Sequence, residues 1–162
     1  MVVAVSEGAR ISFQNVSAMR VLVIHGPNLN LLGEREPAIY GTQTLAELDA
    51  AIATCADELG IEVRCVQHSS EGAIVDELHA ARLTYQAVLI NPGAYTHYSY
   101  AIADAVAAIA IPVLEVHLSN IAAREGFRSR SVVAPVCAGT VAGFGVNSYV
   151  AALHAAAKIR VK

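Results

Sequence analysis

Two polar residues of one short apolar run could form an acid–base pair. In PVLEVH (112–117), Glu115 and His117 stand two positions apart at the end of the run. If the run is a β-strand, both side chains point to the same face of the sheet. A carboxylate beside an imidazole can hold the ring in one tautomer, as a general acid or base requires. A lone histidine at a strand end is more often structural, but the neighbouring glutamate favours a catalytic function.

Positive charge is concentrated just after this run, although the whole chain has a net charge of -3. Arg124 and Arg128 are four residues apart, so on a short helix they would share a face and could bind a carboxylate. Ser119 adds a hydroxyl group between the run and these arginines. The alternative is an exposed cluster without a ligand. Together with Arg35, the cluster favours a site for a small anion.

The segment 26–41 is long for a connection in an α/β protein. Such loops usually have about 2 to 6 residues, and longer ordered loops often cover a ligand. Asn28 can donate and accept hydrogen bonds, while Arg35 and Tyr40 lie five residues apart and could face one cavity. A solvated arginine beside a packed tyrosine is an equally good interpretation, so the loop alone leaves both open.

A third group of polar residues follows the apolar run 87–91. Asn91 ends the run, His97 comes after a Pro-Gly turn, and Asp104 lies one or two helical turns further on. Each has a structural explanation by itself, Asn91 as a turn former and Asp104 as a solvated helix position. Together at one edge of a sheet they fit a ligand with several hydroxyl groups.

All of these residues follow segments with the pattern of buried parallel strands. The predicted strands are 20–25, 61–67, 87–91, 112–117 and one within 136–144, and the predicted helices are 44–60, 70–83, 99–110 and 146–158. Thr44 and Glu47 form a predicted capping box, with Gly60 as C-cap. The alternation predicts an α/β fold, a doubly wound five-stranded parallel sheet in three layers. Ligands of such sheets bind outside the carboxyl ends of the strands.

The predicted elements also suggest how the chain is divided. Residues 1–19 show no clear period and are interpreted as an N-terminal extension of uncertain role. Residues 20–162 are interpreted as a single α/β domain, because a chain of this length can bury one substantial core but not two.

Composition narrows the functional classes. The chain is 55% hydrophobic and 15% charged, with no basic run or aromatic platform, so nucleic acid is not an expected partner. No apolar run reaches the roughly 18 residues of a membrane span, and no signal peptide is recognisable, which predicts a cytoplasmic protein. Its three cysteines are interpreted as buried thiols. Neither a metal site nor a nucleotide-binding loop is expected, because the spacings HExxH, GxGxxG and GxxxxGK[ST] do not occur.

Several separated motifs resemble a known enzyme family. They are IHGPNLNLLGEREPAIYG, QHSSEG, INPGAYTHYS, EVHLSN followed by AREGFR, and AGFGVNSY, and they occur in order between residues 20 and 158. The chain is similar to the type II 3-dehydroquinate dehydratases (type II dehydroquinases). The resemblance implies a flavodoxin-like fold and the conversion of 3-dehydroquinate to 3-dehydroshikimate and water in the shikimate pathway. It further implies that no metal or organic cofactor is used and that the chain forms a homododecamer, a tetramer of trimers.

The resemblance also implies a role for each site residue. Tyr40 resembles the base that removes a proton α to the ketone, Arg35 the group that activates this base, and His117 the acid that protonates the departing hydroxyl group. Glu115 would orient His117, and Asn28 would hold a water molecule or the enolate oxygen. The hydroxyl groups and carboxylate of the substrate would be bound by Asn91, His97, Asp104, Leu118, Ser119, Arg124 and Arg128.

Three positions differ from the residues usual in this family. Tyr98 and Tyr100 are bulkier, and Ala103 stands where a basic residue is frequent, so we expect effects on affinity and assembly rather than on the reaction. Two other functions fit the residues. One is a non-catalytic domain that binds small anions, and the other is a hydro-lyase or isomerase for a related cyclic polyol acid.

Overall fold

Five parallel strands form one twisted sheet at the centre of the molecule. The computed structural model describes residues 18–34 and 42–159. The strands are β1 (Met19–His25), β2 (Ile61–Gln67), β3 (Ala87–Asn91), β4 (Val113–His117) and β5 (Gly139–Ala142), and their order in the sheet is β2-β1-β3-β4-β5. From β1 the chain adds β2 on one side and then crosses back to add β3 on the other side. The order in which strands are added therefore reverses between β1 and β3. This arrangement confirms the predicted doubly wound sheet.

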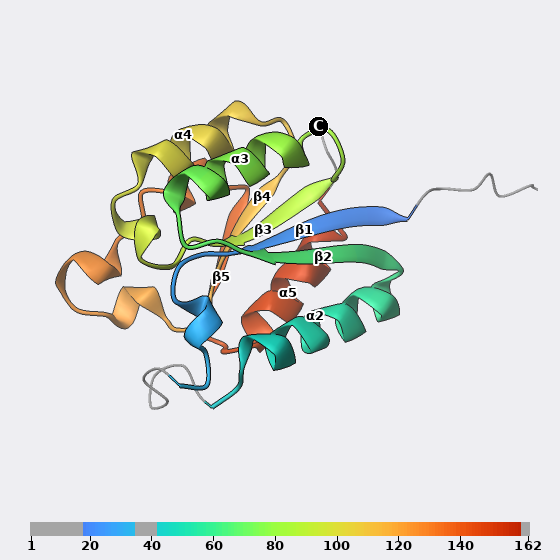
Figure 1. Ribbon diagram of the computed structural model, residues 1–162, viewed down its shortest axis with the longest axis horizontal. Helices are drawn as coiled ribbons and strands as arrows, with labels where there is room; N and C mark the ends of the chain where they lie inside the picture. The colour runs from blue at the N-terminus through green and yellow to red at the C-terminus, as the bar shows by residue number, and fades with distance from the viewer. Residues whose placement is uncertain (1–17, 35–41, 160–162) are drawn as a thin grey trace, which may run out of the picture.

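Helices cover both faces of the sheet and complete three layers (Figure 1). One face carries α2 (Leu45–Leu59) and α5 (Asn147–Ala156), and the other carries α3 (Glu71–Ala81) and α4 (Tyr100–Ala108). Five short 3-10 helices lie in the described parts of the connections. They are η1 (Leu29–Leu31), η2 (Gly93–His97), η3 (Ile121–Ala123), η4 (Gly126–Ser129) and η5 (Ala134–Val136).

Helix α2 begins and ends where its sequence predicts. The Thr44 hydroxyl accepts a hydrogen bond from the Glu47 backbone N–H at 3.2 Å, and the Thr44 backbone N–H donates to the Glu47 carboxylate at 2.8 Å. Gly60 ends the helix in the left-handed region, with φ 66°. The other helices are shorter than predicted. For example, α4 ends at Ala108 because Ile109 adopts an extended backbone and buries its side chain.

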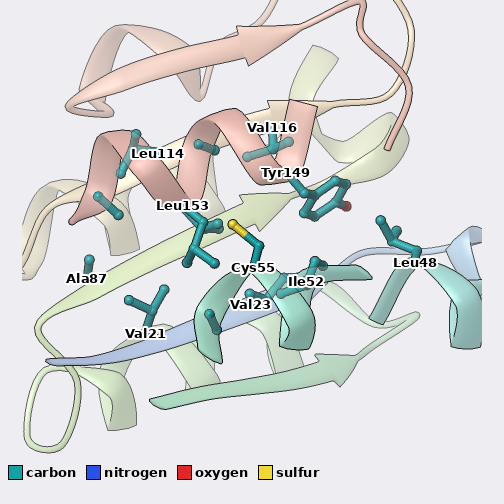
Figure 2. Packing of buried hydrophobic residues seen from close by; sticks show 14 of the residues in the cluster. Val21, Val23, Leu48, Ile52, Cys55, Ala87, Leu114, Val116, Tyr149 and Leu153 are labelled. Carbon is teal, nitrogen blue, oxygen red and sulfur yellow. The ribbon is translucent and has the colours of Figure 1, made fainter. Parts of the chain in front are cut away.

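The core has two parts, one on each face of the sheet. Figure 2 shows the part between the sheet and helices α2 and α5, where Val23, Ile52, Tyr149 and Leu153 pack together. All four side chains have no exposed surface. Cys55 is buried in the same cluster, and burial raises the pKa of its thiol, in keeping with a packing role. Along the described residues, no helix is both long enough and apolar enough to cross a membrane.

Candidate active site

A cavity opens at the carboxyl edge of the sheet, beside the point where the strand order reverses. The last residues of β3 and β4, Asn91 and His117, both border it. Its volume is about 120 Å³, many times the roughly 10–15 Å³ that one water molecule requires, so it can take part of a small organic ligand. The lining comprises Pro27, Asn28, Leu29, Leu32, Asn91, Gly93, Ala94, His97, His117, Leu118, Ser119, Ile121, Arg124 and Arg128.

Glu115 and His117 form the acid–base pair that their spacing in β4 predicts. His117 Nε2 lies 2.5 Å from Glu115 Oε1, and the two side chains are 7% and 0% exposed. The carboxylate thus accepts a hydrogen bond from the imidazole and holds the ring in one orientation. Because Nε2 is used in this bond, Nδ1 is the nitrogen that can serve a ligand in the cavity.

Two hydroxyl groups complete the surroundings of the Glu115 carboxylate. Ser131 Oγ donates to Glu115 Oε2 at 2.9 Å, and Thr96 Oγ1 hydrogen-bonds to Oε1. The Ser131 oxygen itself accepts the backbone N–H groups of Val133 and Ala134, at 3.1 and 2.8 Å. A buried carboxylate requires such partners, since an unpaired charge in the interior is costly. Sequence reasoning did not single out Thr96 or Ser131.

Two glycines bring the loops after β1 and β3 close together at the cavity. A Cβ atom on Gly26 would lie 2.6 Å from the backbone of Pro92, and one on Gly93 would lie 2.9 Å from the Pro27 carbonyl oxygen. Gly93 also has φ 59°. Asn28, which follows, has φ 67°, a conformation that asparagine tolerates better than most residues. The close approach places Asn28 and Asn91 on the same cavity.

Arg124 and Arg128 both line the cavity, but not in the way predicted. Arg124 follows η3 with an extended backbone, whereas Arg128 belongs to η4, so the two do not share the face of one helix. Their common partner is the exposed Glu125, at 3.6 Å from Arg124 Nε and 3.4 Å from Arg128 Nη1. Two guanidinium groups on one cavity with an acid–base pair can bind and transform a small carboxylate.

The chain matches one family along most of its length. The model of the family "Dehydroquinase class II" matches residues 19–157. The chain belongs to the class II dehydroquinase family. A 3-dehydroquinate dehydratase of Pelotomaculum thermopropionicum is 57% identical over 141 residues, which are 87% of this chain and 98% of the relative. One of Desulforudis audaxviator is 56% identical over 141 residues, 87% of this chain and 94% of the relative.

Solved structures of class II dehydroquinases have the same fold. The type II dehydroquinase of Butyrivibrio crossotus superposes with a TM-score of 0.84 at 46% identity, covering 86% of this chain and 97% of that one. The type II dehydroquinase of Propionibacterium acnes gives the same score and identity and covers 88% of this chain and 100% of that one. The flavodoxin-like fold expected from the motifs is therefore confirmed.

Most of the remaining predicted site residues border the cavity. Leu118 and Ser119 follow β4 on its wall, and His97 lines it from η2. His97 Nδ1 lies 2.7 Å from the Arg130 carbonyl oxygen, which holds the ring. The exposed Phe127 packs edge-on against His97. The guanidinium carbon of Arg128 lies 5.6 Å from the centre of the Phe127 ring.

Among the described residues, Asp104 does not border the cavity, and Glu115 reaches it only through His117. Asp104 lies on the exposed side of α4, in a separate shallow hollow with Tyr100 and Ala103. Arg35 and Tyr40 lie outside the described residues. Their roles therefore stay predictions.

One group of side chains has the composition of a metal site. The ligand atoms of His25, Asp49 and Cys65 lie within 4.8 Å of one another. His25 is already hydrogen-bonded through both ring nitrogens, to Asp49 at 2.9 Å and to Tyr149 at 3.1 Å. Burial and the nearby Asp49 raise the pKa of the Cys65 thiol, which opposes the thiolate that a metal needs. The group is better explained as a hydrogen-bonded cluster.

Proposed function

We propose that this chain is a hydro-lyase that converts 3-dehydroquinate to 3-dehydroshikimate and water in the shikimate pathway. Membership of the class II dehydroquinase family along residues 19–157 supports the reaction. The observation that carries the proposal is the cavity itself, where a buried Glu115–His117 pair meets two arginines and two asparagines. The substrate has the matching chemistry, since it is a carboxylate with several hydroxyl groups, one of which must leave.

In the first step, the Tyr40 phenolate removes the proton α to the ketone and an enolate forms. A free tyrosine has a pKa of about 10 and is rarely ionised at neutral pH, so the step requires a neighbouring cation, and Arg35 supplies it. Asn28, at the cavity wall, stabilises the enolate oxygen directly or through a water molecule. The roles of Tyr40 and Arg35 rest on the motif resemblance.

In the second step, the enolate collapses, the carbon–oxygen bond of the ring hydroxyl breaks, and His117 donates the proton that turns the departing group into water. The Glu115 carboxylate stabilises the imidazolium before this transfer and fixes its direction. Proton exchange with solvent then returns Tyr40 and His117 to their starting states.

The remaining residues of the cavity wall bind the substrate. Arg128 and Arg124 bind the ring carboxylate, and Asn91, His97 and the Ser119 region bind the hydroxyl groups. These groups project from the ends of β3 and β4 and from 3-10 helices fixed by hydrogen bonds. Such rigid placement reduces the entropic cost of holding the substrate in a reactive orientation.

A direct assay separates this proposal from its rivals. Purified full-length chain is mixed with 3-dehydroquinate, and the absorbance of the conjugated enone product is followed. The proposal predicts growth of this absorbance without added metal or cofactor. A non-catalytic anion-binding domain would bind the compound without turnover, and that result would refute the proposal. An analogue that lacks the ring carboxylate should turn over far more slowly, whereas equal rates would favour an enzyme for a different cyclic polyol.

We further propose that the chain works in the cytoplasm as a homododecamer, a tetramer of trimers. Support comes from the family resemblance and from the surface at the start of α4, where Tyr98, just before the helix, is 58% exposed and Tyr100 is 73% exposed beside the exposed Asp104. Assembly would bury the two tyrosines and bring Asp104 to a neighbouring site. Analytical ultracentrifugation should give a single species of twelve chains, and a stable monomer at assay concentration would contradict the assembly.

A further inference from the structure

Two hydroxyl groups outside the cavity contact the buried carboxylate of the acid–base pair. They belong to Thr96, in η2, and to Ser131, in the segment between η4 and η5. Thr96 Oγ1 hydrogen-bonds to Glu115 Oε1, the oxygen that also accepts from His117. Ser131 Oγ lies 2.9 Å from Glu115 Oε2 and 2.7 Å from Thr96 Oγ1. The two hydroxyl groups therefore contact both carboxylate oxygens and each other, and neither residue lines the cavity.

Both hydroxyl groups act as hydrogen-bond donors to Glu115. The Ser131 oxygen accepts the backbone N–H groups of Val133 and Ala134 at the start of η5, at 3.1 and 2.8 Å, so its own hydrogen points to the carboxylate or to Thr96. Thr96 has no exposed surface, and its hydrogen must also find a partner inside the protein. The Glu115 carboxylate is the strongest acceptor that it contacts.

This arrangement of donors suits a charged carboxylate and not a neutral acid. A carboxylate only accepts hydrogen bonds, whereas a protonated carboxyl group carries a hydrogen that itself needs an acceptor. Glu115 is surrounded by three donors, which are the two hydroxyl groups and His117 Nε2–H. Hydrogen bonds to the charged form favour that form. Because both oxygens are engaged, the carboxylate cannot turn away from His117 without the loss of a hydrogen bond.

Backbone contacts tie the two hydroxyl-bearing segments together. The Val132 backbone N–H donates to the Thr96 carbonyl oxygen at 2.8 Å. One residue further along each segment, His97 Nδ1 lies 2.7 Å from the Arg130 carbonyl oxygen. Thr96 and Ser131 are thus flanked on both sides by fixed backbone. Neither hydroxyl group can move away from Glu115 unless η2 and the segment 130–134 separate.

We propose that Thr96 and Ser131 are positioning residues that keep the Glu115 carboxylate charged and directed at His117 Nε2. Since neither residue lines the cavity, each acts through Glu115 and not on the substrate. Loss of either hydroxyl group would let the carboxylate turn or take the imidazole proton, and fewer His117 side chains would be ready to donate a proton. The effect on turnover rests on the proposed function, whereas the effect on the Glu115–His117 hydrogen bond does not.

Removal of each hydroxyl group tests the proposal by kinetics. Thr96→Val keeps the shape of the buried side chain, and Ser131→Ala removes one oxygen atom. Each should lower kcat by about three- to tenfold, the effect of about one lost hydrogen bond, and change KM by less than about twofold. Thr96→Ser retains the hydroxyl group and should recover most of the kcat that Thr96→Val loses. A raised KM at constant kcat, or a Thr96→Ser variant no faster than Thr96→Val, would overturn the proposal.

A double-mutant cycle shows whether the effect passes through Glu115. In a Glu115→Gln background, Thr96→Val and Ser131→Ala should each change kcat by less than about twofold, because the charge that the hydroxyl groups hold is already gone. Decreases of equal size in both backgrounds would refute the positioning role.

Ser99→Ala is the matched control for a serine that bonds to backbone N–H groups. Ser99 is 2% exposed, and its oxygen accepts the Ile102 backbone N–H at 3.0 Å at the start of α4. Like Ser131→Ala, the substitution removes a buried acceptor and should lower the Tm. Unlike Ser131→Ala, it should leave kcat unchanged. An equal loss of kcat in the two variants would show that the effect of Ser131 is one of stability alone.

A spectroscopic measurement keeps the test independent of turnover. The hydrogen between His117 Nε2 and Glu115 Oε1, in a contact of 2.5 Å, should give a far-downfield proton NMR signal, assigned by its loss in His117→Ala. This signal should shift and exchange faster with solvent in Thr96→Val and Ser131→Ala, but not in Ser99→Ala. An unchanged signal in both hydroxyl variants would refute the proposal. If wild-type chain fails to dehydrate 3-dehydroquinate, the proposed function falls, and this signal still decides whether the two hydroxyl groups position Glu115.

Discussion

Replacement of Glu115 by glutamine tests the acid–base pair without changing its shape. The wild-type carboxylate accepts hydrogen bonds from His117 Nε2 at 2.5 Å, from Ser131 Oγ and from Thr96 Oγ1. Glu115→Gln keeps the volume but removes the charge that stabilises a protonated His117. A hydrogen bond to a charged group contributes about 1.5–3 kcal/mol. At 1.36 kcal/mol for each tenfold change in rate, kcat should fall by about 10- to 150-fold.

The substitution should lower kcat rather than raise KM, because Glu115 has no exposed surface and is not among the residues that line the cavity. The Tm should stay within a few degrees of wild type or rise, since a buried charge is lost and the Ser131 oxygen, which lies beside Oε2, can accept from the new amide when its hydroxyl turns toward Thr96. Initial rates of enone formation across substrate concentrations separate the two constants. Glu62→Gln, at an exposed position of β2, is the control. If Glu115→Gln keeps kcat within threefold of wild type, His117 does not work as the proposed acid.

Four other expected outcomes concern the site and the core. Tyr40→Phe should lower kcat by at least about 10²-fold with the Tm unchanged, because no base remains; a near-normal rate in the same assay would refute its role. Arg128→Ala should mainly raise KM, and an unaltered KM would exclude its contact with the carboxylate. Ile52→Ala, at a fully buried site, should reduce the free energy of unfolding by about 2–5 kcal/mol in urea titrations, and a smaller loss would mean that the site can collapse. Burial, and next the Glu115 carboxylate, raises the pKa of Cys137 to about 12, so at pH 8 the thiol should stay protonated and react with iodoacetamide more slowly than an unfolded control.

Local sequence patterns were sufficient to predict which segments form the strands and helices of the fold. The predicted bounds of the second and third strands match β2 and β3, and the capping box at Thr44 places the start of α2. The i, i+2 spacing in β4 was enough to pair Glu115 with His117, because alternation along a strand is a local geometric rule. Helix ends were less accurate, since burial of residues such as Ile109 decides where a helix stops.

Residues that meet only through tertiary structure were harder to predict. Arg124, just after η3, and Arg128, within η4, reach the same cavity from separate segments, which their four-residue spacing cannot indicate. Ser131 approaches Glu115 across 16 positions and Tyr149 approaches His25 across 124, and no local period connects such pairs. A buried carboxylate in a strand does signal that partners must exist, but not which ones.

The central claim is that Tyr40 and His117 act on one substrate in one cavity. A crystal structure of the chain with a bound cyclohexene carboxylate that mimics the enolate tests this claim most directly. The account predicts the ligand ring between the Tyr40 hydroxyl and the His117 imidazole, with its carboxylate at Arg128. Electron density that places the two side chains in separate cavities, or the ligand away from His117, would contradict it.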